Sequence, residues 1–259
     1  MTDRLSVQQV KAQLKAVTSF SDPFVQNLRE DPRKGVQTAL QQLQKRLAKR
    51  QAAQVAFEKR FKYERALWQA GNQYVAGMDE VGRGPLAGPV VTCAVILDNK
   101  FDLVEVTDSK MLSRREREQL YLRIVDEAVE VSIAVNSPAV IDQLNIYRAT
   151  QDAMIRAVHE LHHQPSHLIV DAVPLSLPIP QTTLIKGDQK SISVAAASIV
   201  AKEYRDHLMA DYAQLYPGYD FENNMGYGTK QHLAGLQKYG VTPIHRRTFA
   251  PVPNFLSKN

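Results

Sequence analysis

Cysteine is nearly absent from this chain of 259 residues, which contains only Cys93. A single cysteine excludes an intrachain disulfide and a zinc site built on cysteines. Long apolar runs are also missing, so no stretch of ~20 apolar residues is present to span a membrane. Residues 1–16 mix charged with apolar residues, which excludes an ordinary signal peptide. These absences predict a cytoplasmic protein without a membrane anchor.

The composition is that of an ordinary folded protein. Hydrophobic residues make up 44% of the chain and charged residues 23%, which argues against disorder of the whole chain. The length exceeds one average domain of ~150 residues, so one domain with an appendage fits. The formal net charge is +5, a modest excess that favours a polyanionic partner such as nucleic acid.

The first seventy residues have a helical pattern. Asp31-Pro32 gives a capping residue followed by proline at the first helical position, and Gly71-Asn72 ends the pattern. We therefore predict a helical extension over residues 1–70 and a main domain over residues 71–259. Basic residues on its outer face could follow a nucleic-acid backbone or form an ordinary solvated helix face. The apolar residues that repeat at helical spacing are Val36, Leu40, Leu43, Leu47, Phe57, Phe61 and Trp68.

Strands and helices alternate from Tyr74 onward. Ser113 and Glu116 form a capping box for a helix that ends near Ala128. A second helical segment, 137–163, has a break expected near residues 144–147, because Asn145 is a weak helix former. This alternation predicts an α/β sheet with a site along one edge. The predicted strands are Tyr74–Met78, Pro89–Leu97, Val129–Val135, His167–Asp171 and Thr182–Ile185.

Four acids, Asp79, Glu80, Asp171 and Asp188, stand at the ends of strands or helices. Gathered without compensation they would repel one another, so their clustering predicts bound divalent cations. Hard oxygen ligands favour Mg²⁺ or Mn²⁺, and two such ions roughly 3.5–4 Å apart would suit phosphodiester cleavage.

Adjacent side chains of a strand point to opposite faces, so Asp79 and Glu80 need a backbone turn to serve one site. Gly82 and Gly84 supply that freedom. The histidines at positions 159, 162, 163 and 167 are interpreted as solvated residues at a helix end, because no carboxylate completes a familiar zinc ligand set.

Several segments occur in an order that resembles the type 2 ribonuclease H family, specifically ribonuclease HII. The similarity covers about residues 74–249 and implies a ribonuclease H-like fold, a mixed α/β sheet flanked by helices, in which Asp79, Glu80, Asp171 and Asp188 hold the catalytic metals. The matching segments are Asp-Glu-x-Gly-Arg-Gly at 79–84, Asp-Ser-Lys at 108–110, Ile-Val-Asp at 169–171, Lys-Gly-Asp at 186–188, the small-residue helix at 193–202, Gly-Tyr-x-Thr at 226–229, and Pro-Ile-His-Arg-Arg at 243–247.

The resemblance also implies substrate contacts. Backbone groups of Gly82, Arg83 and Gly84 would contact a ribose 2′-hydroxyl, the group that separates RNA from DNA, and Tyr227 would pack on the following deoxyribose. The remaining candidates have two interpretations each. Lys110 and Lys202 bind phosphate or form surface ion pairs, and Ser193 and Thr229 contact the substrate backbone or cap helices. No catalytic role is assigned to His232, Arg246 or Arg247.

The activity implied by this resemblance is metal-dependent hydrolysis of RNA in RNA–DNA hybrids and cleavage on the 5′ side of single ribonucleotides in duplex DNA, leaving 3′-hydroxyl and 5′-phosphate ends. A monomer is expected. Two alternatives stay open: a ribonuclease HIII-like enzyme that needs consecutive ribonucleotides, and a non-catalytic hybrid-binding protein. Arg83 between the two glycines favours the HII type. The helical extension departs from the minimal family enzyme, which begins near the first strand.

Overall fold

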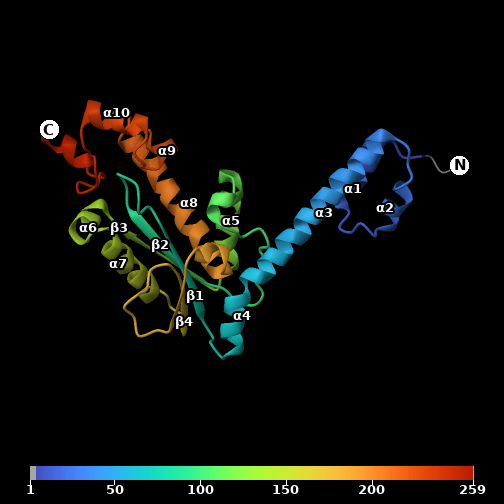
Figure 1. The fold of residues 1–259 in the computed structure, drawn as a ribbon, viewed down its shortest axis with the longest axis horizontal. Coiled ribbons are helices and arrows are strands. Elements are labelled where there is room, and N and C mark those ends of the chain that lie inside the picture. The colour runs from blue at the N-terminus through green and yellow to red at the C-terminus, as the bar shows by residue number, and fades with distance from the viewer. Residues whose placement is uncertain (1–3, 259) are drawn as a thin grey trace. The chain divides into compact units, whose positions relative to one another are not determined.

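The computed structural model describes residues 4–258 (Figure 1). The chain forms two compact units, Met1–Glu58 and Lys59–Asn259. The second unit includes α4 (Lys62–Gln69), which the sequence analysis placed in the extension. It does so because Tyr63, Leu67 and Trp68 of α4 pack against buried residues of the sheet and of the long helix that covers it.

The first unit is built from three helices, α1 (Val7–Ala16), α2 (Pro23–Leu28) and α3 (Lys34–Arg60), the last of which runs two residues beyond the unit. The predicted start of α3 at Asp31-Pro32 is slightly early, because the Asp31 carboxylate instead accepts from the backbone and side chain of Arg33. Arg46 of α3 donates to three carbonyl groups at the end of α1. The core residues include Val10, Leu14, Val25, Val36, Leu40 and Leu43.

A five-stranded mixed sheet organises the second unit, in the order β3-β2-β1-β4-β5. β1 pairs antiparallel with β2 and parallel with β4, and β4 pairs parallel with β5. The α/β architecture predicted from the alternating pattern is therefore confirmed. The strands are β1 (Val75–Val81), β2 (Val90–Ile96), β3 (Glu130–Asn136), β4 (His167–Asp171) and β5 (Gln181–Leu184).

Helices cover both faces of this sheet, with α7 on one face and the long helix α8 on the other (Figure 1). Alternate residues of β1 face them: Ala76 and Met78 join the α7 core, whereas Gly77 faces α8. The helices are α5 (Arg114–Glu127), α6 (Pro138–Leu144), α7 (Ile146–His159), α8 (Ile192–Leu215), α9 (Phe221–Asn224) and α10 (Lys230–Tyr239), and the short 3-10 helices are η1 (Ser109–Met111), η2 (Gly187–Gln189) and η3 (Val252–Lys258).

Small residues bring α8 close to β1, as its sequence predicts. A Cβ atom added at Gly77 would lie 2.3 Å from the Ser193 hydroxyl oxygen, so only glycine fits there. This close approach fixes the height of β1 against α8 just before the strand reaches Asp79.

Local sequence signals were accurate in this unit. Ser113 and Glu116 form the predicted capping box, and Asn145 adopts φ 66° where α6 ends and α7 begins. His162 and His163 both contact the Glu130 carboxylate and stay at the surface, as solvated histidines do. Across residues 4–258, no helix is long and apolar enough to cross a bilayer.

Candidate active site

The four predicted acids lie near the carboxyl ends of β1 and β4. Asp79 and Glu80 lie in the last part of β1, and Asp171 ends the parallel neighbour β4. Because Met78 pairs with Val170, the next residues, Asp79 and Asp171, stand level with each other. Asp188 lies in η2, and the amide of its neighbour Gly187 donates to Asp171 Oδ1 at 2.7 Å. The topology thus joins acids that are far apart in the sequence.

The expectation of a backbone turn at Asp79 and Glu80 was wrong. β1 continues in regular pairing through both acids, with Asp79 opposite Cys93 and Glu80 opposite Thr92, and the chain turns only at Gly82, where φ is 92°. Strand alternation therefore directs the two carboxyl groups to different faces. Gly84 is not needed for the turn itself.

Burial and nearby negative charges raise the pKa values of Asp79, Glu80 and Asp188. Burial is the main cause of the raised pKa of Asp79, and the charges of Glu80 and Asp171 add to it. Burial also raises the pKa of Glu80. The pKa of Asp188 is raised by burial first and then by the nearby carboxylate of Asp108. The acids are therefore electrostatic neighbours whose negative charge is not fully compensated.

Two cationic side chains offset only part of this repulsion. Arg83 Nη1 lies 3.2 Å from Glu80 Oε1, and this contact lowers the pKa of Glu80. The Lys110 ammonium lowers the pKa values of both Glu80 and Asp188, so it stands within electrostatic range of the acid group.

The chemistry of this edge fits divalent cations. All four side chains offer oxygen donors, and Glu80 Oε2 is buried without a hydrogen-bond partner. Within the described residues, no three His, Cys, Asp or Glu side chains already form a group that could hold a metal ion. Oxygen donors of this kind select Mg²⁺ or Mn²⁺.

The loop after β1 is held in shape by two buried arginines, Arg205 and Arg246. Arg246 donates to the carbonyl oxygens of Gly82, Arg83 and Gly88. Arg205 donates to Pro89 and Ala87, and a Cβ atom at Gly82 would lie 2.3 Å from its Nε. Because these guanidinium groups take up the loop's carbonyl oxygens from the inside, they fix the loop's conformation.

Tyr227 stands beside this loop as predicted. Its side chain is 52% exposed, and a Cβ atom at Gly84 would be in van der Waals contact with its ring, 3.5 Å from Cε1. Its carbonyl accepts from His232 Nδ1 at 2.9 Å, and its amide donates to Asn224. The Tyr227 ring is exposed on a fixed backbone, and Gly84 beside it has no side chain to cover the ring. Such a ring can serve as a platform for a planar or sugar ligand.

Three other predicted substrate contacts have partners within the protein. Lys202 pairs with Asp206, one turn along α8. Thr229 caps α10 by accepting from the amide of His232. Ser193 is fully buried and donates to Glu64 of α4, so the structure places its hydroxyl away from any substrate. The helix-capping and ion-pair interpretations therefore describe these three side chains as they stand.

Sequence reasoning missed several residues of this region. Asp108 is buried beside Asp188 and accepts from Gln189 at 3.1 Å, although only its neighbour Lys110 was a candidate. Arg205 gave no usable signal, because it stands among other charged residues of α8 such as Glu203 and Asp206. Arg246 lay in a matching segment but was left without a role.

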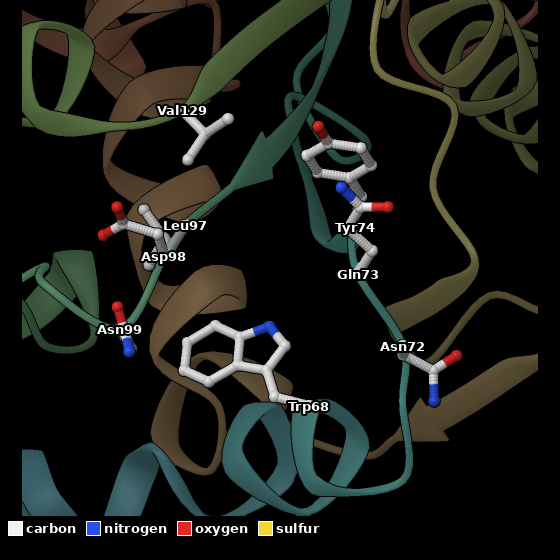
Figure 2. A pocket seen from close by; sticks show the side chains of 8 residues that line it. All are labelled: Trp68, Asn72, Gln73, Tyr74, Leu97, Asp98, Asn99 and Val129. Atoms are coloured by element: carbon white, nitrogen blue, oxygen red, sulfur yellow. The ribbon is translucent and has the colours of Figure 1, made fainter.

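A separate pocket of about 270 Å³ lies where β1 begins and β2 ends, at the opposite end of β1 from Asp79 (Figure 2). Figure 2 shows Trp68 of α4 facing the segments that join β1 and follow β2. None of the four acids lines this pocket, so it is not part of the candidate site. Its lining residues are Trp68, Asn72, Gln73, Tyr74, Leu97, Asp98, Asn99 and Val129.

Solved structures share this fold. The ribonuclease H2 of Pyrococcus horikoshii OT3 superimposes with a TM-score of 0.62 at 27% identity, covering 72% of this chain and 98% of that chain. Bst-RNase HIII, solved in complex with Mn²⁺, has a TM-score of 0.57 at 18% identity over 71% of this chain and 70% of its own, which shows a common fold only. The predicted ribonuclease H-like fold is confirmed.

Sequence relatives extend along the whole chain. A protein of Limosilactobacillus reuteri named ribonuclease HII is 71% identical over 252 residues, 97% of this chain and 98% of that relative. A ribonuclease HII of Levilactobacillus brevis is 57% identical over 99% of both chains.

Family models match both parts of the chain. Residues 76–252 match the Ribonuclease HII model, and residues 6–68 match a model described as the Ribonuclease HII N-terminal domain. The helical extension departs from the minimal family enzyme, but it matches an N-terminal domain that belongs to the family. From the acid edge to the first helix, the chain belongs to the ribonuclease HII family, whose members are ribonuclease H-type endonucleases.

Proposed function

We propose that this enzyme cleaves the phosphodiester bond on the 5′ side of a ribonucleotide, both in RNA–DNA hybrids and at a single ribonucleotide in duplex DNA, leaving 3′-hydroxyl and 5′-phosphate ends. The observation that carries this proposal is the sequence of parts along one edge: the acids Asp79 and Glu80, then the loop Gly82–Gly84, then the Tyr227 ring against Gly84. Such a substrate implies work in the cytoplasm, where DNA and replication products occur.

The acids Asp79, Glu80, Asp171 and Asp188 would hold Mg²⁺ or Mn²⁺. Bound there, the cations would activate water and stabilise the leaving oxygen. Burial of Asp79 and Asp188 prepares this binding, because a divalent cation would relieve the repulsion that raises their pKa values. That the fold relative Bst-RNase HIII was solved with Mn²⁺ agrees with this choice of ion.

The loop and the tyrosine would position the substrate. With the carbonyl groups of Gly82 and Arg83 held by Arg246, the loop of Gly82, Arg83 and Gly84 would present its remaining backbone groups to a 2′-hydroxyl. Tyr227 would then pack on the next sugar, which lacks this hydroxyl. Lys110 would contact phosphate near the acids. One ribonucleotide suffices for such recognition, because only one sugar meets the loop.

A duplex with one embedded ribonucleotide tests this function. Cleavage at its 5′ side is expected with Mg²⁺ or Mn²⁺ and none in EDTA, and Asp171→Asn or Asp188→Asn should abolish turnover with the circular dichroism spectrum unchanged. A requirement for several consecutive ribonucleotides would contradict the proposed specificity. Cation-independent cleavage, or full activity in either variant, would contradict the role of the acids.

The first unit, by this proposal, adds non-specific affinity for the duplex. Residues 1–58 contain ten Lys and Arg residues against five Asp and Glu residues, whereas residues 59–259 contain twenty-two of each. The whole positive excess of the chain therefore lies in the first unit. Its exposed cations include Lys11, Lys15, Lys45 and Lys49.

A pair of double variants tests this role at equal net charge. Lys45→Gln with Lys49→Gln should weaken duplex binding and reduce the slope of log affinity against log salt by about 1–2, because each released phosphate contact contributes ~0.9. Lys100→Gln with Lys238→Gln, in the second unit, should leave the slope unchanged. Equal slopes in both variants would remove the proposed role.

A further inference from the structure

Glu64 is a buried carboxylate inside the second unit that the proposed chemistry does not use. It lies on α4, and its relative exposure is 0%. One oxygen, Oε1, accepts three hydrogen bonds: from Ser191 Oγ at 2.5 Å, Ser193 N at 3.0 Å and Ser193 Oγ at 2.6 Å. Three donors on this one oxygen make a specific contact, whereas the other oxygen, Oε2, is buried without a hydrogen-bond partner.

The donors belong to the start of α8. Ser191 is its N-cap residue, and Ser193 lies in its first turn. A carboxylate there meets the positive end of a 24-residue helix, which stabilises both partners. Glu64 therefore fixes where α8 begins.

The start of α8 is joined directly to two of the acids. The Ser191 amide donates to Gly187 O at 2.8 Å, which closes the η2 turn that contains Asp188. The Gly187 amide donates in turn to Asp171 Oδ1 at 2.7 Å. Backbone hydrogen bonds thus run from the capping residue to both acids.

A second connection leads to Asp79. Ser193 packs so tightly on Gly77 of β1 that no Cβ atom would fit between them. Asp79 follows Gly77 by two residues on the same face of the strand, the face that packs on α8. Any displacement of the α8 start would therefore shift the support of Asp79 as well.

We propose that Glu64 is a positioning residue of the acid group: by holding Ser191 and Ser193, it sets the spacing of Asp188, Asp171 and Asp79 and so their affinity for divalent cations. This inference rests on the proposed function, in which these acids bind the cations. Glu64 falls within the segment that matches the Ribonuclease HII N-terminal domain, yet it serves the catalytic unit. Deletion of residues 1–70 would remove Glu64, whereas deletion of residues 1–58 would keep it.

The test measures Mn²⁺ binding to the full chain by calorimetry without substrate. Glu64→Gln keeps the volume of the side chain but removes the charge, and it should raise the Kd for Mn²⁺ about tenfold, as loss of an outer partner of a metal site does. The Mg²⁺ concentration for half-maximal cleavage should rise similarly, with a smaller change in kcat at saturating Mg²⁺. Ser193→Ala, which removes one donor with little change in volume, should raise the Kd in the same direction and serves if Glu64→Gln fails to fold.

Leu67→Ala on the same helix is the matched control. Leu67 packs in the cluster with Val75 and Val194, so its truncation should lower Tm without touching the hydrogen bonds of Glu64. Its Kd for Mn²⁺ should equal that of the wild type. If Glu64→Gln and Ser193→Ala bind Mn²⁺ within twofold of the wild type, Glu64 only stabilises the fold and the inference is wrong. If Asp188→Asn binds Mn²⁺ as well as the wild type does, the proposed metal site itself fails and the inference fails with it.

Discussion

His232 and His245 face each other through their Nε2 atoms, 3.0 Å apart, and both side chains are buried. The neighbours fix the neutral tautomers. His232 carries its proton on Nδ1, because it donates to the Tyr227 carbonyl, and the Thr242 amide donates to His245 Nδ1. His245 therefore donates through Nε2 to His232. A proton added to His232 would lie on Nε2, against the hydrogen of His245, and a proton added to His245 would lie on Nδ1, against the Thr242 amide. The pair is therefore built for the neutral state.

The first prediction concerns pH and stability. Burial and the neighbouring His232 lower the pKa of His245 to about 4, and burial lowers that of His232. Below pH 6.5 the unfolded chain binds protons that the folded pair does not, so the free energy of unfolding should fall toward pH 4 by up to ~1.4 kcal/mol per pH unit for each histidine. Urea unfolding between pH 5 and 7.5 measures this. His245→Gln should flatten the slope, and the exposed His207→Gln should not.

Two adjacent arginines form the second prediction. Arg246 is fully buried and donates to the loop, whereas Arg247 is exposed. Arg246→Ala should lower stability by about 3 kcal/mol, since it leaves buried carbonyl groups unpaired. It should also reduce the preference for a ribonucleotide over a deoxyribonucleotide at the cleavage site, because the loop loses its shape. Arg247→Ala should change neither by much. Denaturant unfolding and competition cleavage check both, and intact discrimination in Arg246→Ala would contradict the loop's role.

Charge repulsion in the acid group gives the third prediction. The folded-state pKa of Asp79 is raised, so its charged form at pH 7.5 costs stability. In EDTA, Asp79→Asn should therefore increase the free energy of unfolding. With Mn²⁺ the order should reverse, because only the wild type gains from cation binding. Thermal shifts with and without Mn²⁺ decide this, and a variant that is less stable in EDTA would count against it.

Tyr227 supplies the fourth prediction. If its ring packs on a sugar, Tyr227→Phe should keep near-normal activity, and Tyr227→Ala should lose roughly ten- to hundredfold in kcat/KM, the equivalent of ~1–3 kcal/mol of aromatic stacking. Tyr239→Ala is a matched control, because Tyr239 is 51% exposed and lies at the end of α10. Its kcat/KM should stay close to that of the wild type. A large loss in Tyr227→Phe would show instead that the hydroxyl matters.

Local patterns and family motifs predicted most of the catalytic unit. The five strands, the Ser113 capping box and the break at Asn145 follow from rules that act within a few residues. The convergence of the four acids followed from the resemblance rather than from spacing. The strand through Asp79 and Glu80 was misjudged because cross-strand pairing to β2 overrode the flexibility that the glycines offered.

The buried partners were beyond sequence reasoning, because they depend on which distant segments meet. Glu64 carries no local signal of burial, yet it meets Ser193 across 129 positions of the chain. Arg246 meets Gly82 across 164 positions. In both cases the side chain's role is set by tertiary contacts that leave no local pattern.

The single thiol of the chain lies under the acid group, because Cys93 pairs with Asp79 across β1 and β2 and is fully buried. Burial also raises the pKa of this thiol well above its ordinary value, so the thiol should not react with maleimide reagents in the folded protein. A cysteine introduced at any exposed position would then carry a fluorophore alone. The native chain is therefore suited to site-specific labelling for single-molecule spectroscopy, because its one cysteine does not need to be removed first.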